Sequence, residues 1–205
     1  MLERLPELKK QEMIKLILLG GGDKMSKSIL LSIRPQWVAK ILNEEKTIEV
    51  RKRFPKDYVG WVYIYCTKDY KKILFENGGY GWRLNTWNKN KNVITTNNGK
   101  VVARFWCDNV EEIDVYTNRI YETKTLNQLE LLEKSCLTHC ELFEYLGEDY
   151  SKKGGYAIHI SKLEIFNRPK YLTEYYKSYI ETEKGIYYQV LTKAPQNLCY
   201  IEGEE

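Results

Sequence analysis

The pattern of apolar and polar residues changes period several times along the chain, and each change predicts the boundary of an element. Residues 28–33, SILLSI, form a short apolar run typical of a buried strand. Pro35 then suits the first turn of a helix, in which apolar residues recur at helical spacing as far as Leu42. Over residues 47–51, TIEVR, polar and apolar residues alternate. Residues 28–51 therefore predict a strand, a helix and a second strand, in that order.

The rest of the chain predicts more strands and one helical region. β-Branched and aromatic residues are dense in four segments that predict strands: residues 60–67, 100–107, 110–115 and 156–166. Helical spacing appears between residues 117 and 147, where Thr138 and Glu141 form a predicted capping box. Residues 76–99 fit neither period and predict a long loop carrying Trp82 and Trp87, while residues 167–169 predict the end of the last strand. Because strands and helices do not alternate as βαβ units, we expect an α+β fold whose mixed or antiparallel sheet closes into a small barrel.

The two ends of the chain predict extensions to this domain. Residues 1–24 have a short amphipathic pattern followed by three glycines. Residues 21–25, GGDKM, correspond to codons that make a ribosome-binding sequence and a start codon, so we hypothesise that translation begins at Met25. A genuine N-terminal helix is the alternative. We expect the main domain to span residues 25–168 and the Tyr-rich residues 169–205 to pack on it.

Composition and charge narrow the class of protein. The chain has 205 residues, with 17 tyrosines and 5 tryptophans, which argues for a folded protein. Its net charge of +4 permits contact with phosphate but is far below that of a dedicated duplex binder. No apolar run approaches the roughly 20 residues that span a bilayer, so we expect no membrane contact. The five cysteines are scattered and follow no evident secretory signal, which favours reduced thiols and a cytoplasmic location.

Several familiar chemistries lack their motifs. The sequence contains no Walker loop, no GxGxxG and no GxSxG, so we expect no nucleotide hydrolysis, no serine-hydrolase elbow and no cofactor. Cys136, His139 and Cys140 lie within one helical turn, but no second ligand pair follows at a finger-like spacing, so no metal site is predicted. His159 lies in an apolar strand and is interpreted as a satisfied core or sheet-face histidine.

The segment 43–53, NEEKTIEVRKR, carries the main candidate site. Lys46 lies where the helix gives way to the strand, and Glu49 and Arg51 share one strand face. We expect Ile48 and Val50, on the opposite face, to hold the barrel. The charged pair has two interpretations: an exposed ion pair worth under about 1 kcal/mol, or part of a wall that holds a polar ligand.

Three segments together resemble a known family. SILLSIRPQWVAKILNEEKTIEVRKRFP, GWVYIYCT and KVVARFWCDNVEEI resemble the ASCH domain family, a branch of the PUA-like superfamily, over about residues 27–168. Lys46, Glu49 and Arg51 match the family signature Gly-x-Lys-x-x-Glu-x-Arg. Glu44 replaces the glycine, and we expect Asn43 to take the left-handed conformation instead. The resemblance implies a PUA-like small mixed β-barrel with flanking helices and a cleft beside the first helix.

That resemblance also implies a ligand, which is RNA or a modified nucleotide or nucleobase. In this interpretation cations meet phosphate, Glu49 accepts a hydrogen bond from an exocyclic amine, and a tryptophan stacks on the base. Trp37 is expected in the core. The predicted ligand-binding residues are Lys46, Glu49, Arg51, Lys52, Arg53, Ser32, Tyr65, Thr67 and Trp82.

Two other functions stay open. Some small members of the family imply an amidohydrolase acting on an acylated nucleoside such as N(4)-acetylcytidine. Lys46 and Glu49 would then be catalytic, although Glu49 stands where those hydrolases have a threonine. The third possibility is a protein-interaction module that uses the loop at 76–99 and the Tyr-rich tail to hold an unidentified partner.

Overall fold

The computed structural model describes residues 27–69, 71–76, 81–86, 97–116, 120–147, 154–182 and 185–202. The predicted N-terminal extension and Trp87 lie outside these ranges.

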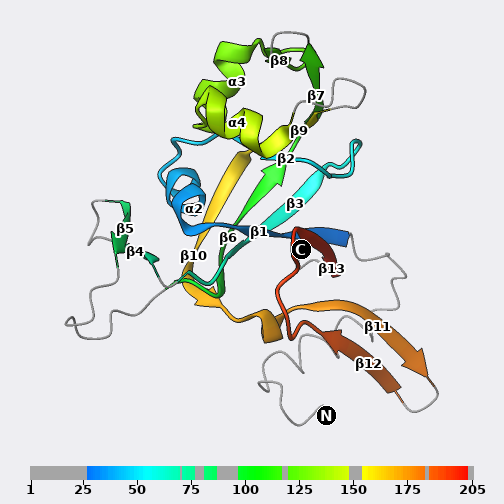
Figure 1. Ribbon diagram of the computed structural model, residues 1–205. Coiled ribbons are helices and arrows are strands. Elements are labelled where there is room, and N and C mark those ends of the chain that lie inside the picture. Colours follow the sequence, from blue (N-terminus) through cyan, green and yellow to red (C-terminus); the bar gives the residue numbers. More distant parts are fainter. Residues whose placement is uncertain are drawn as a thin grey trace.

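The larger sheet contains the most buried strands. Its order is β10 (Ser161–Lys170), β6 (Lys100–Cys107), β3 (Gly60–Cys66), β1 (Lys27–Ile33) and β13 (Leu198–Glu202) (Figure 1). β1 and β3 pair in parallel, whereas the other neighbours are antiparallel. The C-terminal strand β13 therefore completes the sheet that the N-terminal strand β1 begins.

A second sheet joins the first at two corners. Its order is β2 (Ile48–Arg51), β9 (Gly155–His159), β7 (Val110–Tyr116) and β8 (Ile120–Glu122). The chain leaves the larger sheet between β6 and β7 through residues 108–109, and it returns between β9 and β10 at Ile160. The two sheets thus curl into a half-barrel, which confirms the predicted α+β class.

Three α-helices in the described ranges pack on this framework. α2 (Pro35–Leu42) begins with proline in its first turn, as predicted. α3 (Gln128–Ser135) and α4 (His139–Leu146) lie together at one end of the molecule, next to β7 and β9 (Figure 1). Each begins with a capping box, formed by Asn127 with Glu130 and by Thr138 with Glu141. The box predicted at Thr138 is therefore confirmed.

The segment predicted as a long loop is partly a hairpin. β4 (Lys72–Glu76) pairs with β5 (Trp82–Thr86), and Trp82 is only 9% exposed within the main core. The Asn43 side chain accepts a hydrogen bond from the backbone N–H of Trp82 at 2.8 Å and donates to its carbonyl at 3.0 Å. The prediction was wrong because these contacts join residues far apart in the sequence.

Two other element boundaries also differ from the prediction. β10 continues through Pro169 to Lys170 instead of ending at residues 167–169, and its register shifts between Ile165 and Lys170. Because β10 is an edge strand, proline can lack its ladder N–H without leaving an inner neighbour unpaired. Residues 120–122, inside the segment predicted as helical, form β8.

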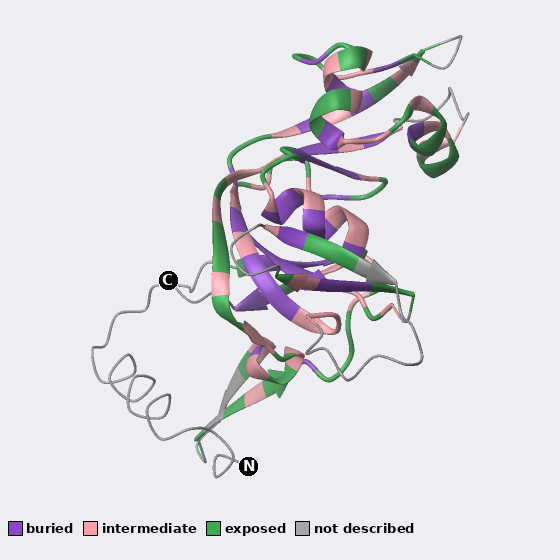
Figure 2. Cartoon of the chain, turned by 90° about the vertical axis from the view of Figure 1, so that its left-hand side faces the viewer, coloured by how far each residue is buried: buried purple, intermediate pink, exposed green. Residues whose placement is uncertain are grey.

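The buried residues of the described chain are coloured purple in Figure 2, and most of the hydrophobic ones belong to three clusters of side chains in contact. The first lies between α2 and the larger sheet and includes Trp82 and Ile158. The second lies between the smaller sheet and α3–α4, and it contains Ile48 and Val50. These two residues therefore anchor the helical end of the molecule and do not belong to the main barrel core. The third lies against Tyr63 and Tyr65 and includes Leu191 from the C-terminal segment.

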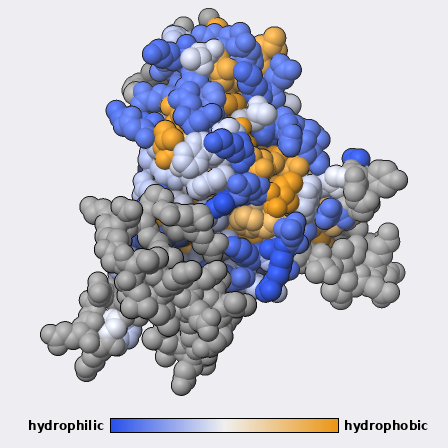
Figure 3. Space-filling view, turned by 180° about the vertical axis from the view of Figure 1, so that it is seen from behind, coloured by the Kyte–Doolittle hydropathy of each residue, from blue (hydrophilic) through white to orange (hydrophobic). Residues whose placement is uncertain are grey.

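The C-terminal segment contributes a hairpin before it rejoins the sheet. A short 3-10 helix, η2 (Leu172–Glu174), precedes β11 (Tyr176–Thr182), which pairs with β12 (Gly185–Val190). Seen from behind, the described surface is mostly hydrophilic, with smaller hydrophobic patches between (Figure 3). None of the described helices is long and apolar enough to cross a membrane.

Candidate functional site

The end of α2 sets the position of the candidate site. Glu45 N–H donates to Lys40 O and Glu44 N–H donates to Ile41 O, both at 2.9 Å, which is the hydrogen-bond pattern of a Schellman motif. Glu44 occupies its left-handed position with φ 60°, while Asn43 has φ −91°. The expectation that Asn43 would be left-handed was therefore wrong. Asn43 instead caps the helix and clamps β5, and the residue at the signature's glycine position makes the turn.

Lys46 follows this turn and points into the protein. It is 2% exposed, and its Nζ donates to Ser135 O at the end of α3 at 2.6 Å. Nζ also lies 3.4 Å from Glu49 Oε2 and 5.5 Å from the centre of the Trp37 ring. Burial lowers the pKa of Lys46, although the nearby Glu49 carboxylate opposes this shift. Lys46 therefore ties the helical end of the molecule to the barrel.

Glu49 is the centre of a buried charge network. It is 5% exposed, and its second oxygen, Oε1, lies 2.9 Å from Arg51 Nη2. Its two carboxylate oxygens thus face the cations of Lys46 and Arg51. The alternative of an exposed ion pair does not apply. Burial and these two contacts leave little of the Glu49 carboxylate exposed to a ligand.

Arg51 links three separate parts of the chain. Its Nη2 donates to Ser32 O of β1 at 2.8 Å, and its Nη1 donates to Asn197 Oδ1 at 3.1 Å. Asn197 immediately precedes β13. The Nε–H of Arg51 is buried and has no hydrogen-bond partner among the residues that the structure describes. This donor is enclosed within the protein, since Arg51 is not among the residues that line the hollow described next.

A hollow lies next to Asn197, the residue whose side chain accepts a hydrogen bond from Arg51. It has a volume of about 350 Å³ and is lined by Arg53, Phe54, Pro55, Asn197 and Leu198. The Asn197 side chain spans its edge, because its Nδ2 donates to Arg53 O at 3.1 Å. Lys52 points elsewhere, with its Nζ 5.6 Å from the centre of the Tyr145 ring of α4. Lys52 and Arg53 were both predicted to bind the ligand, and of these two Arg53 lines the hollow.

The other predicted ligand residues are divided among different places. The hydroxyl of Ser32 donates to Pro195 O at 2.7 Å, so Ser32 lies at the site. Tyr65 lies in the third cluster and lines a second hollow of about 400 Å³, next to Lys68, Tyr171 and Lys193. Thr67 continues β3 by donating its N–H to Ile33 O at 2.8 Å. Trp82 belongs to the core. The structure thus brings together Ser32, Lys46, Glu49, Arg51 and Arg53.

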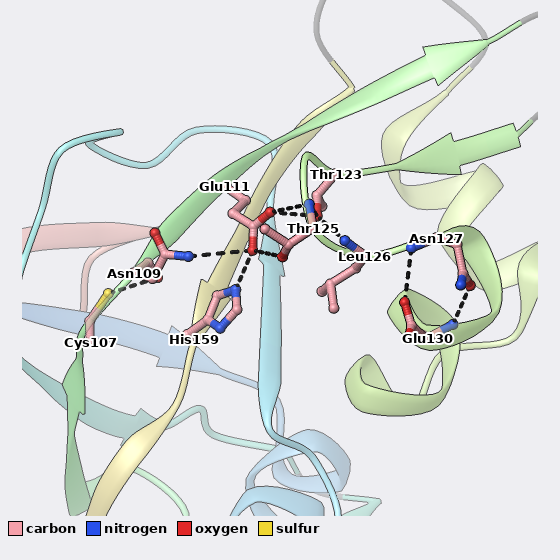
Figure 4. Close-up of polar contacts among 9 residues, drawn as sticks. All are labelled: Cys107, Asn109, Glu111, Thr123, Thr125, Leu126, Asn127, Glu130 and His159. Atoms are coloured by element: carbon pink, nitrogen blue, oxygen red, sulfur yellow. Dashed lines mark hydrogen bonds and ion pairs between the residues drawn. The ribbon is translucent and has the colours of Figure 1, made fainter.

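A second polar cluster surrounds Glu111 on β7 (Figure 4). One carboxylate oxygen lies 2.8 Å from His159 Nε2 and 2.7 Å from Thr125 Oγ1, and the other accepts from Thr123 Oγ1 at 2.7 Å and from Thr125 N–H at 2.9 Å. Burial raises the pKa of Glu111, but the hydrogen bonds from Thr125, Thr123 and His159 outweigh it, so the pKa is lowered. His159 is therefore a satisfied sheet-face histidine, and the cluster fixes the turn that leads into α3.

The thiols and histidine near the start of α4 have structural contacts. Cys136 ends α3 in a left-handed conformation, and its thiol donates to Glu45 O at 3.2 Å. The His139 ring lies edge-on to Tyr121, with centroids 6.1 Å apart. In the described ranges no group of three histidine, cysteine or acidic residues is arranged to hold a metal ion.

Comparison with known proteins identifies the fold. No family model matches the sequence, and no curated protein is significantly similar to it. The crystal structure of ASCH from Zymomonas mobilis matches with a TM-score of 0.50 and 17% identity, covering 85% of this chain and 87% of that chain. The chain has the fold of an ASCH domain. This result confirms the ASCH-like α+β architecture that the resemblance implied.

Two variant structures of the same Zymomonas mobilis ASCH protein also match. A tyrosine-to-phenylalanine variant has a TM-score of 0.44 and 15% identity, covering 72% of this chain and 77% of that chain. A serine-to-alanine variant has a TM-score of 0.48 and 15% identity, covering 86% and 89%. All three matches are too distant in sequence to carry more than the fold.

The sequence pattern missed two contributors to the candidate site. Ser135 offers only its backbone carbonyl, and Asn197 lies 146 residues from Arg51 in a segment without a motif. The signature marks the charged side chains, but it contains no information about which distant segment meets them.

Proposed function

We propose that the protein binds single-stranded RNA and holds one nucleotide in the hollow beside Arg51. The observation that carries the proposal is a hollow with apolar walls and an exposed cation, Arg53, at its rim. The Arg53 guanidinium can donate charge-assisted hydrogen bonds to ligand oxygens. Phosphate and base carbonyl oxygens are both suitable acceptors.

The surroundings of the hollow suit a nucleotide. Its volume of about 350 Å³ falls in the range of small-molecule sites. Phe54 and Leu198 offer apolar surface to a base, and the exposed side chain of Arg53 offers charge to a phosphate. Glu49 carries one negative charge against the two cations of Lys46 and Arg51, which are enclosed, so the exposed charge at the rim comes from Arg53. The ASCH resemblance implies the same ligand class.

The hydrolase alternative receives less support from this geometry. Lys46 is 2% exposed, and its Nζ already contacts Ser135 O and Glu49. A substrate amide can reach it only if the end of α3 separates from the barrel. The hollow beside Arg51 requires no such separation, so binding without reaction is the function that the site supports best.

The test measures binding of a fluorescently labelled single-stranded RNA of about ten nucleotides by anisotropy at several salt concentrations. Arg53→Ala is the informative variant, since removing Arg51 would leave the buried Glu49 with one cation fewer and destabilise the protein by about 3–5 kcal/mol. We expect Arg53→Ala to weaken binding and to reduce the dependence of log K on log salt by about 0.7, the loss of one phosphate contact on a single strand.

The matched control is Lys124→Ala, which removes an equally exposed cation on the turn before α3. It should leave both affinity and salt slope close to those of the original protein. Absence of salt-dependent RNA binding, or equal losses in the two variants, would show that the proposal is wrong.

A further inference from the structure

The side-chain amide of Asn197 makes two hydrogen bonds, one as acceptor and one as donor, as the edge of a nucleobase can. Its carboxamide presents one acceptor, Oδ1, beside one donor, Nδ2. Arg51 Nη1 donates to the acceptor at 3.1 Å, and Arg53 O accepts from the donor at 3.1 Å. A guanidinium can only donate and a backbone carbonyl can only accept, so the orientation of the amide is unambiguous.

Nucleobases carry the same pair of groups at the same spacing. Uracil, for example, presents a carbonyl oxygen next to its N3–H, which matches Oδ1 and Nδ2 of a carboxamide. Arg51 Nη1 and Arg53 O therefore form a complementary donor and acceptor pair for a base edge. In this structure the pair is occupied by the protein itself.

The amide is positioned so that it can be replaced. The backbone of Asn197 is fixed, because its carbonyl accepts a hydrogen bond from Ser32 N–H at 2.9 Å next to the pairing of β1 with β13. The side chain, by contrast, lines the hollow, and its bond to Arg53 O is at the exposed surface. Rotation of one side chain therefore opens the base-edge position without moving the sheet.

We propose that Asn197 is an internal competitor that occupies the base-edge position of the nucleotide site, and that a bound base replaces its carboxamide between Arg51 and Arg53. This inference rests on the proposed function and adds the mode of base recognition and a built-in limit on affinity. Each bound base must first break two hydrogen bonds of the protein. The apparent affinity for RNA therefore equals the intrinsic affinity multiplied by the fraction of molecules whose Asn197 side chain has left this position.

Two substitutions at Asn197 test the inference with opposite expected signs. Asn197→Ala removes the competitor and leaves both recognition groups available, so RNA should bind about three- to tenfold more tightly. Asn197→Asp keeps an acceptor that pairs more strongly with Arg51 and adds negative charge near the phosphate, so RNA should bind more weakly. A purely structural role for Asn197 would shift both variants in the same direction. A thermal melt checks that each variant stays folded.

A pair of mononucleotides tests the base edge directly. Uridine 5′-monophosphate offers N3–H to Arg53 O, whereas its N3-methyl derivative has no donor there and adds a methyl group. Calorimetric titration of the Asn197→Ala variant should give at least about tenfold weaker binding for the methylated nucleotide.

The results separate this inference from the proposed function. If RNA binds in a salt-dependent manner that requires Arg53, but Asn197→Ala does not tighten binding and the methyl group has no effect, the internal competitor is wrong and the RNA site stands. If no salt-dependent RNA binding occurs at all, the proposed function fails first and the competitor fails with it.

Discussion

Glu44 holds a backbone conformation that glycine adopts more readily. It has φ 60° at the position where a Schellman motif usually has glycine, and the family signature has glycine at that place. The chain accepts the strain because the hydrogen bonds that end α2 and the placement of Lys46 depend on this turn. Because Glu44 adopts the left-handed conformation that glycine favours, Lys46, Glu49 and Arg51 keep the spacing of the signature after the turn.

We predict that Glu44→Gly raises the free energy of unfolding by about 0.5–1 kcal/mol, because glycine has no Cβ to clash in the left-handed region. Urea unfolding measures the change. Glu45→Gly is the matched control, since Glu45 is also exposed but is not among the positive-φ residues of the described chain, and it should be destabilising. Glu44→Gln separates the loss of charge from the loss of strain. A gain in Glu44→Gln as large as in Glu44→Gly would contradict the backbone explanation.

The charged residues of the site could be predicted from the sequence, but their burial could not. Lys46, Glu49 and Arg51 match a signature with fixed local spacing, and the alternation of the strand puts two of them on one face. Their exposure depends on Ser135 and Asn197, which meet them only in the folded chain. The same limit explains why the sequence did not reveal that two cations enclose Glu49.

At the scale of elements, local sequence patterns predicted most strands and the capped helix at Thr138. They failed for elements whose structure depends on contacts with residues far away in the sequence. The capping box at Thr138 is local, so it was found. The hairpin of β4 and β5 depends on Trp82 entering the core and on the clamp from Asn43, which no local period reveals. The alternation of residues 47–51 correctly placed Ile48 and Val50 on a buried strand face. Which core they join depends on the position of α3 and α4, which the alternation does not reveal.

The turn that starts α3 depends on one buried carboxylate. Glu111 accepts hydrogen bonds from Thr123 and Thr125 (Figure 4), and its replacement by glutamine puts an amide donor where donors already converge. We predict that Glu111→Gln lowers the free energy of unfolding by about 1–3 kcal/mol at pH 7. Chemical unfolding of the two proteins measures this difference.

The pH dependence of that difference identifies the charge as its source. The pKa of Glu111 in the folded protein lies below its ordinary value of 4.5, so the unfolded chain takes up the proton first as the pH falls. The stability that the carboxylate contributes is thus present above pH 4.5 and is lost as the pH falls through the folded-state pKa. Asp114→Asn, an exposed substitution on the same strand, should change little. A difference between Glu111→Gln and the original protein that stays constant from pH 7 to acid would contradict this account.

At the scale of the whole molecule, the ASCH signature lies where three parts of the chain meet. Lys46 reaches the end of α3, Glu49 joins Lys46 to Arg51, and Arg51 reaches the segment before β13. The network therefore connects the barrel, the helical end and the C-terminal segment. Within the described part of the chain, its C-terminal side borders a hollow, and the proposed ligand site therefore lies at Arg53 and Asn197.

The most direct measurement of the central claim is ultraviolet cross-linking of single-stranded RNA to the protein, followed by mass spectrometry of the modified peptides. An RNA bound in the hollow beside Arg51 should cross-link to peptides that contain Phe54 or Leu198, and the signal should increase in Asn197→Ala. Cross-links confined to the second hollow around Tyr171, with none at Phe54 or Leu198, would contradict the account.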